Sequence, residues 1–343
     1  MNLHFTRTNG PADELIDRLI GLVGNVHHPE IVREMIIAAL KAGLEDEEKA
    51  DMKLMNSTLK EMRFTAKIFG PYSRVKKVTV FGSARTRQEE PVYAMAQELG
   101  RALAASGYMV ITGAGLGIMQ AVNEGAGPEN SFGVNIRLPF EQRPNPVLEG
   151  NPRLITYKYF FNRKVAFLKE AHAIALFPGG FGTLDEAMET LTLVQTGKRA
   201  PLPLVLVDEP GGEYWVKWLR FFEDELLAQG YIMASDFNLF ERVDSVPAAI
   251  ETINHFYRRY HSLRHVERKL VLRLTSEISH HALGELNNLF ADILAPGGRI
   301  FLSGPLPEEA DEPELADLPR LVLDFNNRDF GKLRSLINML NDY

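Results

Sequence analysis

The sequence contains no cysteine, which excludes disulfide bonds and thiolate metal ligands. This absence fits a reducing compartment, and we expect a cytoplasmic protein. No apolar run reaches the roughly 18–20 residues that span a bilayer, and the opening residues, MNLHFTRTNG, lack the apolar segment of a signal peptide. The sequence also has fewer positive than negative side chains: it contains 38 Lys and Arg residues and 45 Asp and Glu residues, which give a net charge of -7. That balance argues against broad binding to nucleic acid or to a membrane surface.

What the chain does have is enough apolar sequence for more than one average domain. Its 343 residues are 45% hydrophobic, whereas an average domain has about 100–200 residues. Residues 1–72 show helical spacing of apolar side chains, residues 73–261 alternate short apolar runs with amphipathic helices, and residues 262–343 form a smaller unit after a basic, polar stretch. We expect a helical N-terminal extension, a central α/β domain and a small accessory α/β domain.

The central segment has the pattern of a parallel sheet that helices cover on both faces. Short apolar runs followed by glycine, proline or a helical pattern are typical of strands buried on both faces. We expect strands at residues 78–81, 108–112, 132–136, 173–177 and 204–207, and helices at residues 183–196, 214–229 and 246–260. The predicted fold class is α/β, a Rossmann-like doubly wound parallel sheet.

The C-terminal unit is expected to mix strands and helices without a catalytic cluster. Its predicted strands lie at residues 271–274, 299–302 and 321–325, its helices at residues 282–294 and 330–340, and an acidic surface loop at residues 305–319. An accessory, regulatory or oligomerisation role follows as the default expectation.

A first glycine-rich segment follows a predicted strand at TGAGLGIMQAVNEGA, residues 112–126. Gly113, Gly115 and Gly117 precede a helix whose first N–H groups would form an anion site. The spacing departs from a dinucleotide fingerprint, because Ile118 occupies the position of the third glycine. Arg137, at the end of the next strand, leaves an NADP-dependent enzyme open as an alternative. A mononucleotide or a phosphosugar fits the spacing better.

A second, richer segment is PGGFGTLDE, residues 178–186. Gly179, Gly180 and Gly182 form a turn whose N–H groups can converge on an oxyanion, and Thr183 is placed to cap the next helix or to contact phosphate. Glu186 has two interpretations. It completes a capping box three residues after Thr183, or it faces a ligand one helical turn beyond the glycine turn.

Positive charge near these turns comes from Arg163 and Lys164, which lie on a predicted helix before the strand that leads to the second turn. Adjacent helix positions diverge by about 100°, so we expect Arg163 to face the site and Lys164 to contact phosphate or support the site from behind. Ser83 follows the first strand and could donate to a phosphate or ribose oxygen. The histidines lack ligand spacing, and we expect no metal site.

Together with GVNIRLPFEQ, residues 133–142, these motifs resemble the LONELY GUY family of cytokinin riboside 5′-monophosphate phosphoribohydrolases and their bacterial relatives, the nucleotide 5′-monophosphate nucleosidases. The resemblance covers about residues 75–260. It implies hydrolysis of the N-glycosidic bond of a nucleoside 5′-monophosphate, without a cofactor. Some members have been labelled lysine decarboxylases, but no lysine here is placed for a pyridoxal Schiff base with an acidic partner for the ring.

The resemblance also implies roles for individual residues. It makes Arg163 and Glu186 the catalytic pair. The expected substrate or phosphate contacts are Ser83, Gly115, Gly117, Met119, Glu141, Lys164, Gly179, Gly180, Gly182, Thr183 and Thr192.

Three further expectations accompany the resemblance. Because family enzymes commonly act as dimers, we expect a homo-oligomer. A non-catalytic carrier of a nucleotide or phosphorylated cofactor, built on the same fold as the molybdenum-cofactor carriers, is the alternative. The two terminal units, absent from the short plant-type enzymes, leave substrate choice and regulation open.

Overall fold

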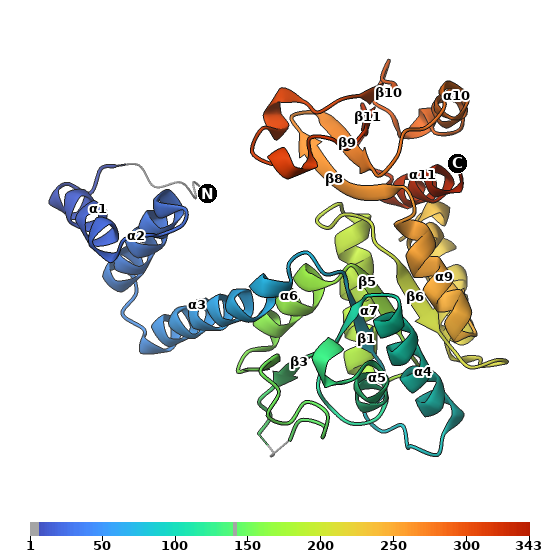
Figure 1. The fold of residues 1–343 in the computed structure, drawn as a ribbon, viewed down its shortest axis with the longest axis horizontal. Helices are drawn as coiled ribbons and strands as arrows, with labels where there is room; N and C mark the ends of the chain where they lie inside the picture. Colours follow the sequence, from blue (N-terminus) through green and yellow to red (C-terminus); the bar gives the residue numbers. More distant parts are fainter. Residues whose placement is uncertain (1–6, 140–142) are drawn as a thin grey trace. The chain divides into compact units, whose positions relative to one another are not determined.

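The computed structural model describes residues 7–139 and 143–343 and divides into two compact units, Met1–Arg63 and Phe64–Tyr343 (Figure 1). In the first unit, Arg33 of α2 (Pro29–Glu45) forms ion pairs with Asp13 and Asp17 of α1 (Pro11–Val23). Helix α3 (Lys49–Phe69) continues into the second unit. The helices expected before residue 73 are therefore present, while the limits of the three domains stay a prediction.

The second unit is built on a parallel sheet of seven strands, in the order β4-β3-β2-β1-β5-β6-β7. The strands are β1 (Lys77–Phe81), β2 (Met109–Thr112), β3 (Ser131–Ile136), β4 (Leu154–Tyr157), β5 (Ala173–Leu176), β6 (Leu204–Val207) and β7 (Glu241–Val243). The order reverses between β1 and β5, and ligands of such sheets bind beyond the carboxyl ends of the strands at this switch point. The expected doubly wound sheet is confirmed, and only the edge strands β4 and β7 were not predicted.

Alternating residues of β1 face different helical layers, as the two-residue repeat of a strand requires. Val78 and Val80 pack with residues of α4 (Pro91–Ala105), α5 (Ile118–Ala126) and α9 (Val246–Phe256). Phe81 packs on the other face. The helices there are α6 (Phe160–Glu170), α7 (Phe181–Gln195) and α8 (Tyr214–Phe221).

Two of the long helices expected in this domain are shorter than predicted. Helix α8 ends at Phe221 and continues as the π-helical segment Phe222–Leu227. Helix α9 ends at Phe256, because Tyr260 already begins β8 (Tyr260–Val266), a strand that was not predicted.

Strand β8 starts a second, antiparallel sheet in the order β10-β11-β9-β8. The other strands are β9 (Lys269–Leu274), β10 (Ile300–Ser303) and β11 (Arg320–Leu323), and the helices are α10 (His280–Leu289) and α11 (Phe330–Asp342). Helix α11 joins this sheet to the parallel one. Its buried Arg334 pairs with Glu241 of β7 at 3.2 Å and lies 4.4 Å from the ring centre of Phe256.

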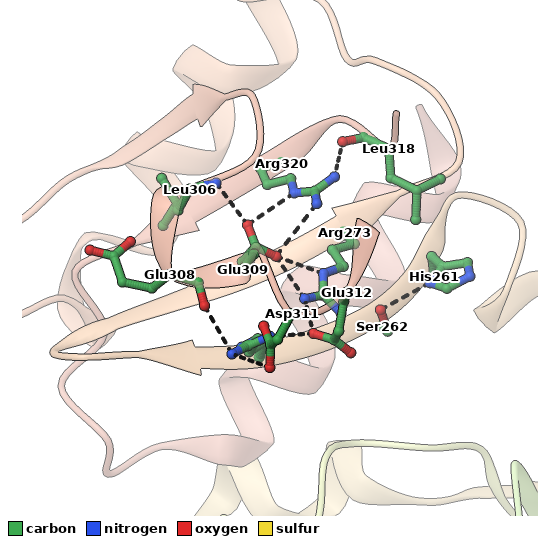
Figure 2. Close-up of polar contacts among 11 residues, drawn as sticks. His261, Ser262, Arg273, Leu306, Glu308, Glu309, Asp311, Glu312, Leu318 and Arg320 are labelled. Atoms are coloured by element: carbon green, nitrogen blue, oxygen red, sulfur yellow. Dashed lines mark hydrogen bonds and ion pairs between the residues drawn. The ribbon is translucent and has the colours of Figure 1, made fainter. Parts of the chain in front are cut away.

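The acidic segment expected as a surface loop at residues 305–319 is partly buried. It contains two 3₁₀ turns, Pro307–Glu309 and Pro313–Leu315. Figure 2 shows Glu309, which is 3% exposed, accepting hydrogen bonds from Arg273 and Arg320 at 2.8 and 3.2 Å. A buried charge is tolerated when it is paired in this way, so this part of the loop neutralises two arginines of the sheet.

Among the residues that the structure describes, no helix is both long and apolar enough to cross a bilayer.

Candidate active site

Turns from three neighbouring strands meet at the switch point of the parallel sheet. Ser83, after β1, donates its backbone N–H to the Pro178 carbonyl after β5, at 3.1 Å, and its own carbonyl accepts from Ile118 N at 3.0 Å. Gly117, whose φ is 63°, precedes Ile118, and a Cβ at this glycine would overlap the Ser83 carbonyl oxygen. The structure therefore brings Ser83, Gly117 and the second glycine turn together.

Two buried asparagines hold the first glycine turn in place. Asn145 donates from Nδ2 to the Gly115 carbonyl and to Asn123 Oδ1, both at 3.0 Å. Asn123 Oδ1 also accepts from the Thr112 hydroxyl at 2.8 Å. Neither asparagine was singled out from the sequence, because an isolated Asn gives no spacing signal. These hydrogen bonds tie the loop at Gly115 to both asparagines, although Asn123 Nδ2 is buried without a hydrogen-bond partner among the described residues.

The second glycine turn opens α7 at Phe181, with Gly180 as the N-cap and no side-chain cap. Thr183 is thus inside the helix, where its N–H donates to the Gly180 carbonyl at 3.0 Å. Because Thr183 does not cap this helix, the capping-box interpretation of Glu186 is wrong. The buried Thr183 hydroxyl lies against Gly179, where a Cβ would overlap it.

The start of α7 presents an open backbone. A Cβ added at Gly180 or Gly182 would meet no heavy atom within 4 Å. The first N–H groups of a helix have no acceptor within that helix, and the helix dipole favours an anion beside them. This end of α7 therefore has the geometry of an oxyanion or phosphate site.

Arg163 of α6 lies against Gly113 of the first glycine turn. Its Nε donates to the Val134 carbonyl of β3 at 2.9 Å, and its guanidinium carbon is 5.0 Å from the ring centre of Phe167. A Cβ at Gly113 would lie 2.5 Å from Arg163 Nη2 and 2.8 Å from Met119 Sδ. Gly113 thus leaves room for both Arg163 and Met119. Burial lowers the pKa of Arg163, and the nearby Glu186 partly offsets that effect.

Glu186 is the buried carboxyl group of the site, only 7% exposed. Lys164 Nζ lies 3.3 Å from Glu186 Oε1, while Glu186 Oε2 is buried without a hydrogen-bond partner among the described residues. Burial raises the pKa of Glu186 to about 7, although Lys164 and Arg163 act to lower it. A carboxyl group with such a pKa exchanges protons near neutral pH, which suits acid–base chemistry.

Lys164 lies in a carboxylate cluster. Besides Glu186, its Nζ pairs with Asp185 at 2.8 Å and Glu189 at 2.7 Å. Burial alone would lower the pKa of Lys164, but the hydrogen bonds to Asp185 and Glu189 raise it above the usual value. Lys164 therefore contacts Glu186 directly, whereas Arg163 acts on it only through its charge, and the role of each cation stays a prediction.

One expected residue does not join this group. Thr192 is exposed six residues beyond Glu186, about 9 Å further along α7, and its hydroxyl donates to the Met188 carbonyl. Glu141 lies outside the described residues.

A cavity of about 480 Å³ beside Ser83 and Gly179 adds two residues that sequence reasoning missed. Tyr214 donates its hydroxyl to the Gly179 carbonyl at 2.6 Å. Asp208 directly follows β6 and is 3% exposed, and its Oδ2 is buried without a hydrogen-bond partner among the described residues. Its position at the carboxyl end of a central strand was the signal that could have identified it.

Within residues 7–139 and 143–343, no group of three or more His, Asp or Glu side chains is arranged to hold a metal ion.

Known proteins resemble this chain mainly over its parallel-sheet domain. Residues 118–253 match the family model described as "Possible lysine decarboxylase". The rice (Oryza sativa subsp. japonica) "Probable cytokinin riboside 5'-monophosphate phosphoribohydrolase LOGL9" is 28% identical over 190 residues, which cover 54% of this chain and 80% of the relative. The rice "Cytokinin riboside 5'-monophosphate phosphoribohydrolase LOG" is 31% identical over 167 residues, covering 47% of this chain and 65% of the relative.

Among solved structures, a molybdenum cofactor carrier protein from Chlamydomonas reinhardtii is 21% identical, with a TM-score of 0.36, over 52% of this chain and 96% of that one. The family model and the phosphoribohydrolase relatives agree with the motifs that meet at the switch point. Over this domain, the chain is similar to the LONELY GUY family, as its motifs indicate.

Proposed function

We propose that the protein hydrolyses the N-glycosidic bond of nucleoside 5′-monophosphates, releasing the free base and ribose 5-phosphate. The observation that carries this proposal is the buried Glu186 carboxyl group just beyond the open start of α7, with one unpartnered oxygen, with Lys164 in contact and with the charge of Arg163 acting on it. The names of the phosphoribohydrolase relatives support the same reaction.

The proposed phosphate site is the N-terminus of α7. Gly180 and Gly182 leave space there for a phosphate to approach the backbone N–H groups, and the Thr183 hydroxyl is close to the same turn. A phosphate held at this point fixes the sugar through interactions remote from the reacting bond. Such binding energy positions the anomeric carbon for reaction.

The proposed chemistry assigns the proton transfer to Glu186. Cleavage of an N-glycosidic bond passes through an oxocarbenium-like state, which a nearby carboxylate stabilises. Ionised Glu186 accepts a proton from water as the hydroxyl oxygen bonds to C1′ and the C1′–N bond breaks; the departing base takes up a proton from solvent, and Glu186 returns its own proton to solvent. Arg163 offers fixed donors that anchor the substrate and stabilise negative charge developing on the base.

The proposal is tested with purified full-length protein and five nucleotides, AMP, GMP, CMP, UMP and IMP. Free base is measured by chromatography and ribose 5-phosphate by a coupled assay. Equal amounts of both products from at least one nucleotide are expected. Tight nucleotide binding without product from any of them would instead identify a non-catalytic carrier. Cytokinin ribotides are assayed in the same way, as a further substrate class. A cytoplasmic location and a homo-oligomeric state stay predictions.

A further inference from the structure

A second large cavity lies at the opposite edge of the parallel sheet. Its volume is about 1010 Å³, at the upper end of the roughly 300–1,000 Å³ of small-molecule sites. It is lined by Lys76, His172 and Leu202, which precede β1, β5 and β6, and by the start of β8. The proposed active site lies at the other ends of these strands, so the two sites are distinct.

The walls of this cavity concentrate positive charge on a protein whose net charge is -7. Arg74, Lys76, Lys198 and Arg199 all line it, and Glu314 is the one carboxylate among the lining residues. None of the four cations forms an ion pair in the described part of the chain. Four such cations around one cavity repel each other unless an anion binds between them.

Two of these cations are held in place by the structure. Arg199 donates from Nη2 to the Ala171 carbonyl, and its Nε is buried without a hydrogen-bond partner among the described residues. Lys76 Nζ lies 4.0 Å from the ring centre of Tyr257, whose hydroxyl donates to the His172 carbonyl at 2.5 Å. These contacts fix the positions of both cations, and Arg199 Nε is left as a donor without an acceptor among the described residues.

The pKa values of the two histidines in the cavity are lowered by the positive charges around them. His172 accepts from Lys77 N through Nδ1 at 3.2 Å, so Nε2 carries the proton of the neutral ring and is a donor. Burial and the charges of Lys77, Lys76 and Arg199 lower the pKa of His172 to about 4.

His261 lies at the start of β8, where its Nδ1 forms a hydrogen bond with the Ser262 hydroxyl (Figure 2). Its pKa is also lowered, first by burial and then by the charges of Lys76, Arg273 and Arg320. Arg273 and Arg320 are already paired with Glu309, so the cations open to a ligand are those that line the cavity.

We propose that this cavity binds a small molecule carrying two or more phosphate groups. Each phosphate offers several strong acceptor oxygens, and linked phosphates match several cations at once. A ligand with a single negative charge would leave most of the cationic groups unpaired. The proposal does not rest on the reaction proposed for Glu186, because no residue is shared between the two sites.

The test uses the full-length protein and inorganic pyrophosphate in isothermal titration calorimetry at neutral pH and low salt, with inorganic phosphate as the comparison. The key variant combines Arg74→Glu with Lys198→Glu, since both side chains are exposed and their loss spares the core. A matched control reverses two exposed cations outside the cavity, Lys67→Glu with Arg101→Glu. Thermal melting of each variant confirms folding.

Wild type and control are expected to bind pyrophosphate saturably and more tightly than phosphate. The cavity variant should bind at least about 100-fold more weakly, since two charge-assisted hydrogen bonds are lost at about 1.5–3 kcal/mol each and 1.4 kcal/mol is tenfold. Absence of saturable binding in the wild type would overturn the proposal. Equal affinity in the cavity variant and the control would overturn it too, because the anion would then bind elsewhere.

Discussion

Lys164 Nζ lies 3.3 Å from Glu186 Oε1, yet Glu186 Oε2 is buried with no hydrogen-bond partner among the described residues. An unsatisfied buried carboxylate oxygen costs about 1–3 kcal/mol or more, and a fold built for stability alone would avoid it. One carboxylate oxygen of Glu186 is thus paired with Lys164, and the other has no hydrogen-bond partner among the described residues. We interpret this as preparation for a proton transfer.

The rate should depend on pH through Glu186. Burial raises its pKa to about 7, and the proposed reaction needs the ionised form. In the free enzyme, kcat/KM should therefore rise about tenfold per pH unit below that pKa and level off above it. Glu189 also helps to raise this pKa, so Glu189→Gln should move the inflection to lower pH. A profile that instead falls as the pH rises through 7 would make Glu186 an acid rather than a base.

The same pKa predicts a stability effect. A carboxyl group whose pKa is raised from 4.5 to about 7 on folding binds more protons in the folded state, so stability falls as pH rises through this window. Glu186→Gln removes the group and should stabilise the protein at pH 8, relative to pH 4.5, by on the order of 3 kcal/mol. Urea unfolding followed by Trp215 and Trp218 fluorescence measures the change. Equal effects at both pH values would contradict the assigned burial cost.

Gly113→Ala tests the placement of Arg163. The new Cβ would lie 2.5 Å from Arg163 Nη2 and 2.8 Å from Met119 Sδ. Both atoms are at the ends of flexible side chains, so the fold should survive while the guanidinium moves. We expect kcat/KM to fall by about 100-fold, the cost of a misplaced group of this kind, with little change in melting temperature. Gly284→Ala is the control, because its Cβ meets nothing within 4 Å.

Gly182→Ala tests the proposed phosphate site. A methyl group there meets no protein atom within 4 Å, and alanine favours a helix more than glycine. The variant should be as stable as the wild type or slightly more so. Since the methyl group occupies the space of the phosphate, KM for a nucleoside 5′-monophosphate should rise about tenfold or more. An unchanged KM would place the phosphate elsewhere.

The fold was largely predictable because its signals are local. The strands from 78–81 to 204–207 were predicted from short apolar runs. Strands buried on both faces are apolar at nearly every position, so each gives a continuous apolar run in the sequence. Edge strands β4 and β7 and the start of β8 were missed. Their burial is mixed along each strand, so no continuous apolar run marks them.

The candidate site was predictable only where motifs mark it. Glycine spacing identified the turns around Ser83, Gly117 and Gly182, but Thr183 was misread as a cap because the sequence cannot show that α7 begins at Phe181. Asn145 is positioned by tertiary contacts and carries no pattern of its own, whereas Asp208 was missed although it directly follows the predicted strand at residues 204–207. The basic cavity could not be predicted from the sequence at all, because its residues come from segments far apart in the chain.

The most direct test of the account compares nucleotide hydrolysis by the wild type, Glu186→Gln and Asp185→Asn. Asp185 pairs with the same Lys164 but is exposed, so it is the matched control. We predict that Glu186→Gln lowers kcat by about 10²–10⁴-fold while nucleotide affinity is largely kept, and that Asp185→Asn retains most of the activity. Undiminished release of base and ribose 5-phosphate by Glu186→Gln would contradict the account.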